Sequence, residues 1–336
     1  MGGGVERRPG RWGPGGPVTF RAPNPRTSVS VLVVGTVAFD TVETPFGRAE
    51  RILGGSATYT ALAARVVGAP VHLSAVVGGD FPASHVEALE ARGVDTEGLV
   101  RDEDGLTFFW AGRYSYDLGT RETLATDLNV LAGFRPRLPD AYRQPDVVCL
   151  GNLDPEVQAA VIDQTEGARP LVIADTMNYW IENTPDALAE TLRRVDVLVI
   201  NDEEARQLAG VPGLVQAARA VRAMGPETLV IKKGEHGALL FAGDAVFAAP
   251  ALPLEEVVDP TGAGDTFLGG FAGHLARVGT SPEALRQAVV VGSALASFCV
   301  EAFGTDRLLD VTADDLDGRL DAFRRLSAVP ETVGIG

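Results

Sequence analysis

The sequence predicts an α/β fold in which a mostly parallel central sheet is covered by helices on both faces. Short runs of valine, leucine and isoleucine recur along the chain, and helical segments separate them. Uninterrupted apolar runs are typical of strands buried on both faces, and strands that alternate with helices usually pair in parallel. Polar residues follow several of these runs, which is where ligands bind in such folds.

The N-terminal half begins this alternation at Val29. Gly54-Gly55 precedes an apolar helical pattern that ends at Gly68, and Gly93 closes a second helix. The elements expected here are a strand at 29–35, a helix at 56–67, a strand at 71–77 and a helix at 82–92.

Two segments differ from the alternation. A polar stretch at 41–52, with Pro45 and Gly47, is expected to form a hairpin, and 106–126 is expected to form antiparallel strands around a polar loop. Together they predict a small β lid over the ligand-binding edge of the sheet. The lid residues Trp110, Arg113, Tyr114, Tyr116 and Asp117 are candidates for the substrate pocket, a dimer contact or simple packing.

The C-terminal half resumes the alternation and ends in two long helices. Its expected strands are 147–150, 171–174, 197–200 and 229–232, and its expected helices are 155–166, 185–194, 202–209, 213–224, 263–278 and 282–300. A hairpin of 237–241 and 245–247 turns at Gly243-Asp244.

Composition limits the partners of this 336-residue chain. Its formal net charge of −16 is the opposite of what binding to nucleic-acid phosphates or to an acidic membrane surface requires. No apolar run is long enough to span a bilayer. The two cysteines, Cys149 and Cys299, lie in apolar runs and give no disulfide framework, which indicates a reducing, cytoplasmic location.

Residues 1–28 form a separate region. They contain seven Gly, five Pro, five Arg and one Glu, with no apolar segment of the kind a signal peptide needs. We expect a disordered basic tail at 1–28, followed by one domain at 29–336.

The most informative stretch is 259–271, with Gly262-Ala263-Gly264-Asp265 at its centre. Small residues let the backbone turn sharply into a helix and leave amide N–H groups free to hold an anion. A carboxylate beside an anion site is unfavourable unless it handles a proton. A kinase centre explains both features, with the amides holding a phosphoryl group while Asp265 accepts the proton of the attacking hydroxyl. Alternatively, the aspartate only complements the helix dipole.

This stretch resembles the C-terminal signature of the ribokinase family, also called the PfkB family of carbohydrate and nucleoside kinases. The resemblance extends over about residues 29–310. It implies a ribokinase-like three-layer fold, Asp265 as catalytic base, and Gly262, Ala263 and Gly264 as the anion hole.

Further positions follow from the same resemblance. Asp259 and Thr261 match a monovalent-cation site of many members, which implies K⁺, and Thr261 also belongs to the nucleotide side. Lys232, Gly234 and Gly237 lie near the place where members bind nucleotide phosphates. For the two lysines at 232–233, an exposed basic pair before a hairpin is the alternative.

The acceptor site is implied by the N-terminal half. Asp40 ends a Gly-x-x-x-x-Asp element whose aspartate accepts hydrogen bonds from sugar hydroxyls, and Gly54-Gly55 matches a diglycine where the backbone approaches the sugar. A turn residue and a flexible lead into a helix are the alternatives. Asn152 follows the strand 147–150 at the ligand-binding edge and is a further candidate, with a turn role as its alternative.

Asn201 and Glu204 match the Asn-x-x-Glu element that organises Mg²⁺ and phosphate through water. The same spacing is a helix capping box, and both roles are compatible.

Two departures from the family pattern concern the acceptor. Tyr59 stands where many members have a substrate-contacting Asn, and Phe81-Pro82 follows Asp80 where many members have Gly two residues on.

The sequence thus predicts an ATP-dependent kinase that phosphorylates a hydroxyl of a small sugar or sugar-like acceptor with ATP and Mg²⁺. A nucleoside kinase, a non-catalytic sugar and ATP sensor, and a vitamin-precursor kinase are the alternatives. The lid is expected to exclude water and is the predicted contact of a homodimer.

Overall fold

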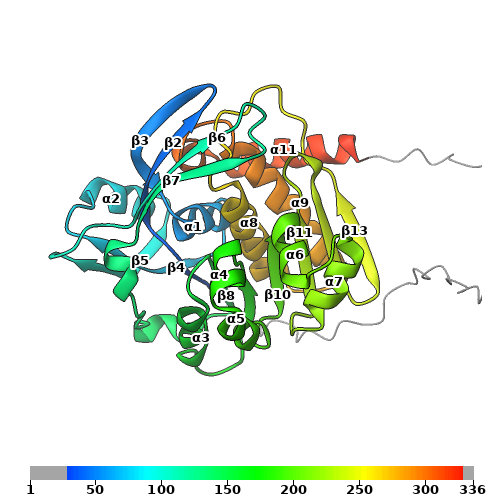
Figure 1. Cartoon of the computed structure of the whole chain (residues 1–336), viewed down its shortest axis with the longest axis horizontal. Coiled ribbons are helices and arrows are strands. Elements are labelled where there is room, and N and C mark those ends of the chain that lie inside the picture. Colours follow the sequence, from blue (N-terminus) through cyan, green and yellow to red (C-terminus); the bar gives the residue numbers. More distant parts are fainter. Residues whose placement is uncertain (1–28, 328–336) are drawn as a thin grey trace, which may run out of the picture.

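The computed structural model describes residues 29–327, so the tail expected at 1–28 lies outside the described residues. Figure 1 shows a central sheet with helices on both sides and a smaller sheet beside it. This is the predicted α/β architecture with its separate β lid.

The central sheet has nine strands in the order β13-β12-β11-β10-β9-β8-β1-β4-β5. All neighbours pair in parallel except at β12 and β13, which form the predicted hairpin at one edge. The strands are β1 (Val31–Val34), β4 (Val71–Gly78), β5 (Val94–Asp102), β8 (Val147–Leu150), β9 (Leu171–Ala174), β10 (Val197–Asn201), β11 (Thr228–Lys232), β12 (Ala238–Ala242) and β13 (Ala245–Ala249).

Strand β1 explains the two covered faces. Val31 and Val33 point into one hydrophobic cluster, and Leu32 and Val34 point into another, because successive side chains of a strand face opposite sides. The first cluster is covered by α1 (Ser56–Val66), α2 (Ala83–Ala91), α8 (Ala263–Val278) and α9 (Pro282–Cys299). The second is covered by α3 (Pro155–Asp163), α5 (Pro185–Leu192), α6 (Asp202–Ala209) and α7 (Leu214–Arg222).

Helices α1 and α8 pack closely because α8 carries glycines at the contact. A Cβ on Gly269 would lie 2.2 Å from the carbonyl oxygen of Thr60, and one on Gly273 would lie 3.0 Å from the Cα of Ala64. The hydroxyl of Thr60 also donates a hydrogen bond of 3.1 Å to the backbone oxygen of Asp265. The start of α8 is therefore fixed against α1.

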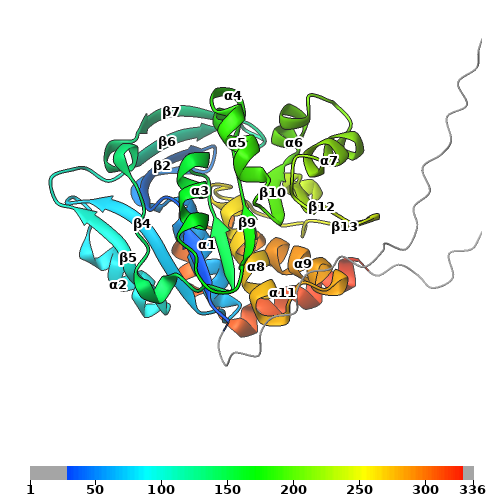
Figure 2. The ribbon, with the colours of Figure 1, turned by 90° about the horizontal axis from the view of Figure 1, so that it is seen from below.

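The lid is a four-stranded sheet in the order β3-β2-β6-β7. Its strands are β2 (Ala38–Thr44), β3 (Gly47–Gly54), β6 (Phe109–Tyr114) and β7 (Arg121–Asp127). The two expected hairpins are confirmed, and they join through a parallel pairing of β2 with β6. In Figure 2 the lid strands lie together as a layer of their own.

Several elements went unassigned in the sequence: β5, α4 (Asn178–Asn183), α10 (Asp306–Asp310) and α11 (Ala313–Leu326). β5 has charged residues such as Asp95 and Glu97 at alternate positions, so its sequence lacks the continuous apolar run of a buried strand. An edge strand tolerates these residues because it is covered less completely. Helix α11 packs on α9 through Leu316 and Phe323.

Within residues 29–327, no helix is both long and apolar enough to cross a membrane.

Candidate active site

The predicted anion-binding turn lies at the start of α8. Gly262 has φ 75°, a left-handed conformation that favours glycine, and no side chain caps the helix. A Cβ at this position would lie 2.5 Å from the Tyr59 ring, so only glycine fits. The N–H of Ala263 donates a long bond of 3.3 Å to the carbonyl of Pro260. The uncapped first turn and its dipole favour an anion in front of the helix.

Asp265 stands in that first turn and is partly exposed. Burial, with a smaller contribution from the nearby Asp175, raises the pKa of its carboxyl to about 7 against the opposing effects of Lys232 and Arg121. A carboxyl group with a pKa near 7 is suited to accept and release a proton at neutral pH.

Lys232, at the end of β11, reaches the same place from the sheet. Its Nζ lies 3.3 Å from Oδ2 of Asp175, and a Cβ on Gly264 would lie 3.0 Å from that Nζ. Burial lowers the pKa of Lys232, but Asp175 and Glu204 outweigh it, so the pKa is raised and the lysine is charged. The alternative of an exposed basic pair is wrong for Lys232, whose side chain is 16% exposed.

Glu204 and Asn201 form the capping box that the spacing allowed. The side chain of Asn201 accepts from the N–H of Glu204, and the side chain of Glu204 accepts from the N–H of Asn201, each at 2.8 Å. Burial raises the pKa of Glu204 to about 7, and Asp175 adds to the rise. Only one oxygen of Glu204 is used by the cap, so the other remains available for a ligand.

Asp40, on β2, lies against the diglycine. A Cβ on Gly54 would lie 2.0 Å from Oδ2 of Asp40, and one on Gly55, where φ is 93°, would lie 2.4 Å from the carbonyl oxygen of Thr36. No side chain larger than hydrogen fits at either position, because neighbouring atoms lie too close to the backbone. The role of both glycines is therefore more than flexibility. Burial raises the pKa of Asp40 to about 7, opposed by the N–H of Gly55, with Asp259 and Asp265 adding to the rise.

Tyr59 lies beneath the turn. Its side chain is 1% exposed, and its hydroxyl has no hydrogen-bond partner within residues 29–327. Burial raises the pKa of this phenol, and Asp40 is the largest of the charges that add to the effect. A buried hydroxyl without a partner is costly, and this one is free to bond to a ligand.

Asp259 and Thr261 hold the loop before α8. The two oxygens of Asp259 accept from the N–H groups of Thr261 and Gly304, at 2.8 and 3.2 Å. Burial raises the pKa of Asp259 against the effect of these bonds. The hydroxyls of Thr261 and Tyr114, 147 residues apart, share a hydrogen bond of 3.1 Å that joins the lid to this loop.

The remaining predicted residues are already bonded or belong to a turn. Asn152 accepts from Nε1 of Trp180 at 2.8 Å and donates to Sδ of Met177 at 2.9 Å, so both ends of its amide are occupied. Gly234 and Gly237 adopt positive φ in the turn after β11, and a Cβ on Gly237 would lie 2.0 Å from the carbonyl of Ala249. These glycines shape a turn.

Two residues near the centre were not predicted as site residues. Asp175 directly follows β9 at the sheet edge and holds Lys232. Arg121 was seen only as part of a lid strand. Its guanidinium opposes the pKa rises of Asp40 and Asp265, which burial chiefly causes. Arg121 lies opposite Tyr114, one of the lid aromatics, in the pairing of β6 with β7. Knowledge of this register would have identified Arg121 as a neighbour of the site.

The site carries oxygen donors rather than a closed metal centre. Among residues 29–327, no three His, Cys, Asp or Glu side chains are arranged to hold a metal ion. The free oxygen of Glu204 nevertheless fits Mg²⁺, which prefers oxygen ligands and keeps several waters. The arrangement can thus hold an anion, a proton acceptor and a hydrated cation together.

A family model for pfkB family carbohydrate kinases matches residues 30–311. A cytidine kinase of Thermococcus kodakarensis is 30% identical over 74% of this chain and 89% of its own length. A nucleoside kinase of Methanothermobacter thermautotrophicus is 28% identical over 84% of this chain and 93% of its own.

Solved structures agree in fold. The nucleoside kinase of Methanocaldococcus jannaschii has a TM-score of 0.71 at 22% identity, covering 87% of this chain and 98% of its own. Ribokinase of Arabidopsis thaliana has a TM-score of 0.71 at 19% identity, covering 88% of this chain and 99% of its own. The expected ribokinase-like fold and family are confirmed. The chain belongs to the pfkB family of carbohydrate kinases and is a phosphotransferase.

Proposed function

We propose that this protein transfers the γ-phosphoryl group of ATP to a hydroxyl of a small sugar-bearing acceptor, and that a nucleoside is the preferred acceptor. The observation that carries the proposal is the meeting of three groups at the start of α8. The uncapped turn at Gly262, the proton-accepting Asp265 and the ammonium of Lys232 lie together there. Phosphoryl transfer needs these parts and little else from a protein.

In the proposed reaction, the acceptor oxygen attacks the γ-phosphorus while its proton passes to the Asp265 carboxylate. The bond from the γ-phosphorus to the bridging oxygen breaks, and ADP leaves with that electron pair. The N–H groups of the first turn and the Lys232 ammonium stabilise the charge of the transferring group. The pKa of Asp265, raised by burial to about 7, suits a base that works at neutral pH.

The acceptor is proposed to lie between Asp40 and the turn. The Asp40 carboxylate accepts hydrogen bonds from acceptor hydroxyls, the Gly54-Gly55 backbone lies beside it, and the unpartnered hydroxyl of Tyr59 donates to the acceptor from below. Asn152, whose amide is bonded at both ends, shapes this site by holding Trp180.

The nucleotide is proposed to bind over the ends of β10 and β11. The free oxygen of Glu204 holds Mg²⁺ through water, and Asn201 fixes that carboxylate. Bound Mg²⁺ neutralises phosphate charge. Lys232 and Thr261 face the phosphates, and the turn of Gly234 and Gly237 leaves room for the nucleotide. An acidic protein needs such local neutralisation, because its net charge of −16 repels ATP.

A monovalent cation is part of the proposal at Asp259. Each oxygen of this carboxylate accepts one N–H bond, from Thr261 and Gly304, and keeps a second lone pair that fits K⁺. Replacing K⁺ by choline in the assay is expected to lower the rate.

A nucleoside is favoured because both curated relatives described above carry nucleoside-kinase names. Trp110, half-buried on the lid face that turns toward the site, offers a surface on which a base stacks. A free sugar is the second candidate, favoured by the depth of Asp40, which is 4% exposed. A non-catalytic sensor is a poorer fit, since it has no need of a base at Asp265.

The acceptor proposal is tested with labelled ATP, Mg²⁺ and a panel of cytidine, adenosine, inosine, ribose and fructose. We expect labelled product with at least one nucleoside, at a higher kcat/KM than with either sugar. Ligand binding without product on any acceptor would contradict the proposal and favour the sensor.

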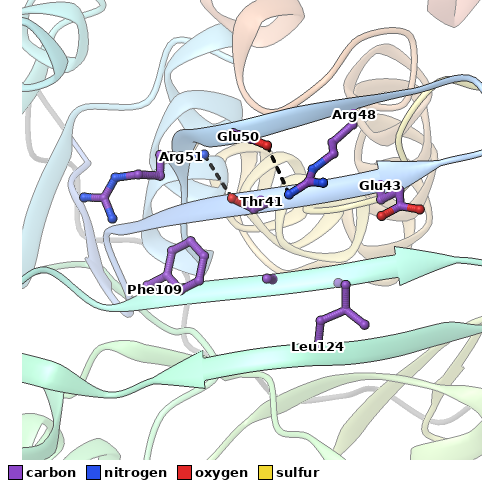
Figure 3. A pocket seen from close by; sticks show the side chains of 9 residues that line it. Thr41, Glu43, Arg48, Glu50, Arg51, Phe109 and Leu124 are labelled. Atoms are coloured by element: carbon purple, nitrogen blue, oxygen red, sulfur yellow. Dashed lines mark hydrogen bonds and ion pairs between the residues drawn. The ribbon is translucent and has the colours of Figure 1, made fainter.

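The lid is also proposed to join two copies of the chain in the cytoplasm. Figure 3 shows a pocket on the lid, lined by residues of all four strands, including Phe109 and Leu124. Leu124 is 45% exposed there, and Phe46 nearby in the β2–β3 turn is 62% exposed. Light scattering is expected to give the mass of a dimer.

Both described cysteines are buried and unbridged, which fits a reducing compartment.

A further inference from the structure

Lys232 lies within reach of more than one carboxylate at the edge of the central sheet. Its Nζ bonds to Oδ2 of Asp175 at 3.3 Å, and a Cβ on Gly264 would lie 3.0 Å from the same nitrogen. Asp265 is the next residue after Gly264, yet within residues 29–327 the only ion pair of Lys232 is the one with Asp175. The ammonium therefore stands beside the proposed base without forming an ion pair with it.

Asp175 is itself held firmly at the end of β9. The N–H of Thr176 donates to Oδ1 of Asp175 at 2.8 Å, and the N–H of Asp175 donates to the carbonyl of Leu150 at 2.9 Å. The carbonyl of Asp175 accepts from Nε2 of Gln158 at 3.0 Å, and Gln158 is only 1% exposed. These bonds fix the carboxylate and leave its Oδ2 to meet Lys232.

The charge of Lys232 acts on the proposed base. Burial chiefly raises the pKa of Asp265 to about 7, Asp175 adds to that rise, and Lys232 opposes it. The other titratable side chains that interact with Asp265 are Asp40, Tyr59, Arg121, Cys149 and Cys299. An ammonium in direct contact with Asp265 would lower the pKa of this carboxyl below 7, because an ion pair favours the charged form. Such a carboxylate would bind the proton of an attacking hydroxyl less well.

We propose that Asp175 is a positioning residue that holds Lys232 on the phosphate side of the turn and so keeps its ammonium from pairing with Asp265. A buried ammonium needs a counter-charge, and Asp175 supplies it from a strand two positions away in the sheet. Lys232 then remains available to the phosphates, while Asp265 keeps its affinity for a proton. This inference rests on the proposed kinase function and assigns a role that Asp175 performs through Lys232.

The kinetic test compares full-length D175N and D175E with E203Q, which removes an exposed carboxylate from the first turn of α6. In D175N, the loss of the Asp175 charge and the approach of Lys232 both lower the pKa of Asp265. We therefore expect kcat to fall about 30-fold and the acid limb of the kcat/KM profile to move to lower pH by about one pH unit.

The two other variants serve as controls. D175E keeps the charge and is expected to keep the acid limb where it is, and E203Q is expected to stay within about threefold of the unchanged chain. An acid limb that lies at the same pH in D175N as in the unchanged chain would overturn the inference. Product formation by the unchanged chain would still support the kinase in that case.

A double variant tests whether Asp175 acts through Lys232. K232M/D175N removes both charges of the buried pair, so neither charge is left uncompensated. We expect its kcat to lie within about threefold of that of K232M alone, because the effects of two residues that act as one unit do not add. A further large loss in the double variant would show that Asp175 acts by another route, which contradicts the inference.

A third measurement does not depend on turnover, because Lys232 and Lys233 are the only lysines of the chain. Selective ¹³C labelling of lysine gives two Cε signals in an NMR spectrum, and K233M identifies the signal of Lys232. Burial lowers the pKa of Lys232, and Asp175 is the largest of the charges that raise it. We expect this signal to titrate at lower pH in D175N than in the unchanged chain. An equal titration in both would overturn the inference even if no acceptor in the panel reacts.

Discussion

Lys232 and Asp175 form an ion pair of 3.3 Å at the ends of β11 and β9, with side chains only 16% and 9% exposed. The two strands are separated by β10, so the pair bridges two positions of the sheet edge. Removing one partner of a buried pair leaves the other charge uncompensated. Asp175 thus holds Lys232 at the turn where the phosphoryl group is proposed to pass.

The first prediction concerns Lys232. Lys232→Met is expected to lower kcat/KM for ATP about 100-fold, because a charged donor to the phosphates is lost. Lys233→Met changes the neighbouring lysine and serves as the control, with an effect of less than about threefold. Steady-state kinetics at varied ATP separate the two variants. Equal activity of both would contradict the placement of Lys232 at the phosphates.

The second prediction concerns pH and the buried Asp40. Burial raises its pKa from 3.8 to about 7, so the folded state holds a proton that the unfolded state releases. The protonated Asp40 therefore makes its full contribution to the free energy of unfolding below about pH 4. This contribution is lost as the pH rises to 7, a change on the order of 4 kcal/mol. Asp40→Asn stays neutral throughout and escapes this loss.

Thermal unfolding at about pH 4.5 and pH 8 measures the effect of Asp40→Asn. We expect the variant to gain in Tm over the unchanged chain as the pH rises, while its KM for the acceptor increases. A constant Tm difference across this range would show that the carboxyl is not perturbed in the fold.

The third prediction concerns Gly54. A Cβ there would lie 2.0 Å from Oδ2 of Asp40, so Gly54→Ala displaces that carboxylate. The KM for the acceptor is expected to rise about 30-fold or more, because a misplaced group loses its binding geometry. In Gly318→Ala, on α11, a Cβ meets nothing within 4 Å, and KM should not change. A KM for Gly54→Ala that matches the Gly318 variant would place the acceptor elsewhere.

The fourth prediction separates function from stability at Tyr59. Its buried hydroxyl lacks a partner in the described part of the chain, so Tyr59→Phe should leave Tm unchanged or higher. The KM for the acceptor is expected to rise about tenfold, as a donor to the acceptor is lost.

Tyr142 is the matched control for Tyr59. It is fully buried as well, but its hydroxyl donates to Asp95 at 2.6 Å and accepts from the N–H of Gly98 at 3.2 Å. Tyr142→Phe should therefore lower Tm and leave KM as it is. A lower Tm in Tyr59→Phe, with unchanged KM, would make that hydroxyl structural.

Most of the fold could be predicted because its strands are buried on both faces and are therefore continuously apolar. β1, β8, β9, β10 and β11 were all located in this way, and glycines marked the helix ends. β5 was missed because charged residues such as Asp95, Glu97 and Arg101 interrupt its apolar positions, as an edge strand allows. The lid hairpins were predicted, but the parallel pairing of β2 with β6 depends on a contact between distant segments that local patterns do not record.

The candidate site was predicted where one short segment carries it, as at Gly262–Asp265. Asp175 and Arg121 could not be assigned, because their roles come from Lys232 and Tyr114, which are distant in sequence. Asn152 was expected to face a substrate, yet its amide is engaged by Trp180 and Met177. A residue type and a position at the sheet edge do not determine which partner a side chain finds.

The central claim is that Asp265 accepts the proton of the attacking hydroxyl. It is tested most directly by Asp265→Asn, which keeps the shape of the side chain and removes its basicity. We expect phosphoryl transfer from labelled ATP to fall about 1,000-fold or more, while calorimetry gives an ATP affinity within about threefold of the unchanged chain. Turnover close to that of the unchanged chain would contradict the claim.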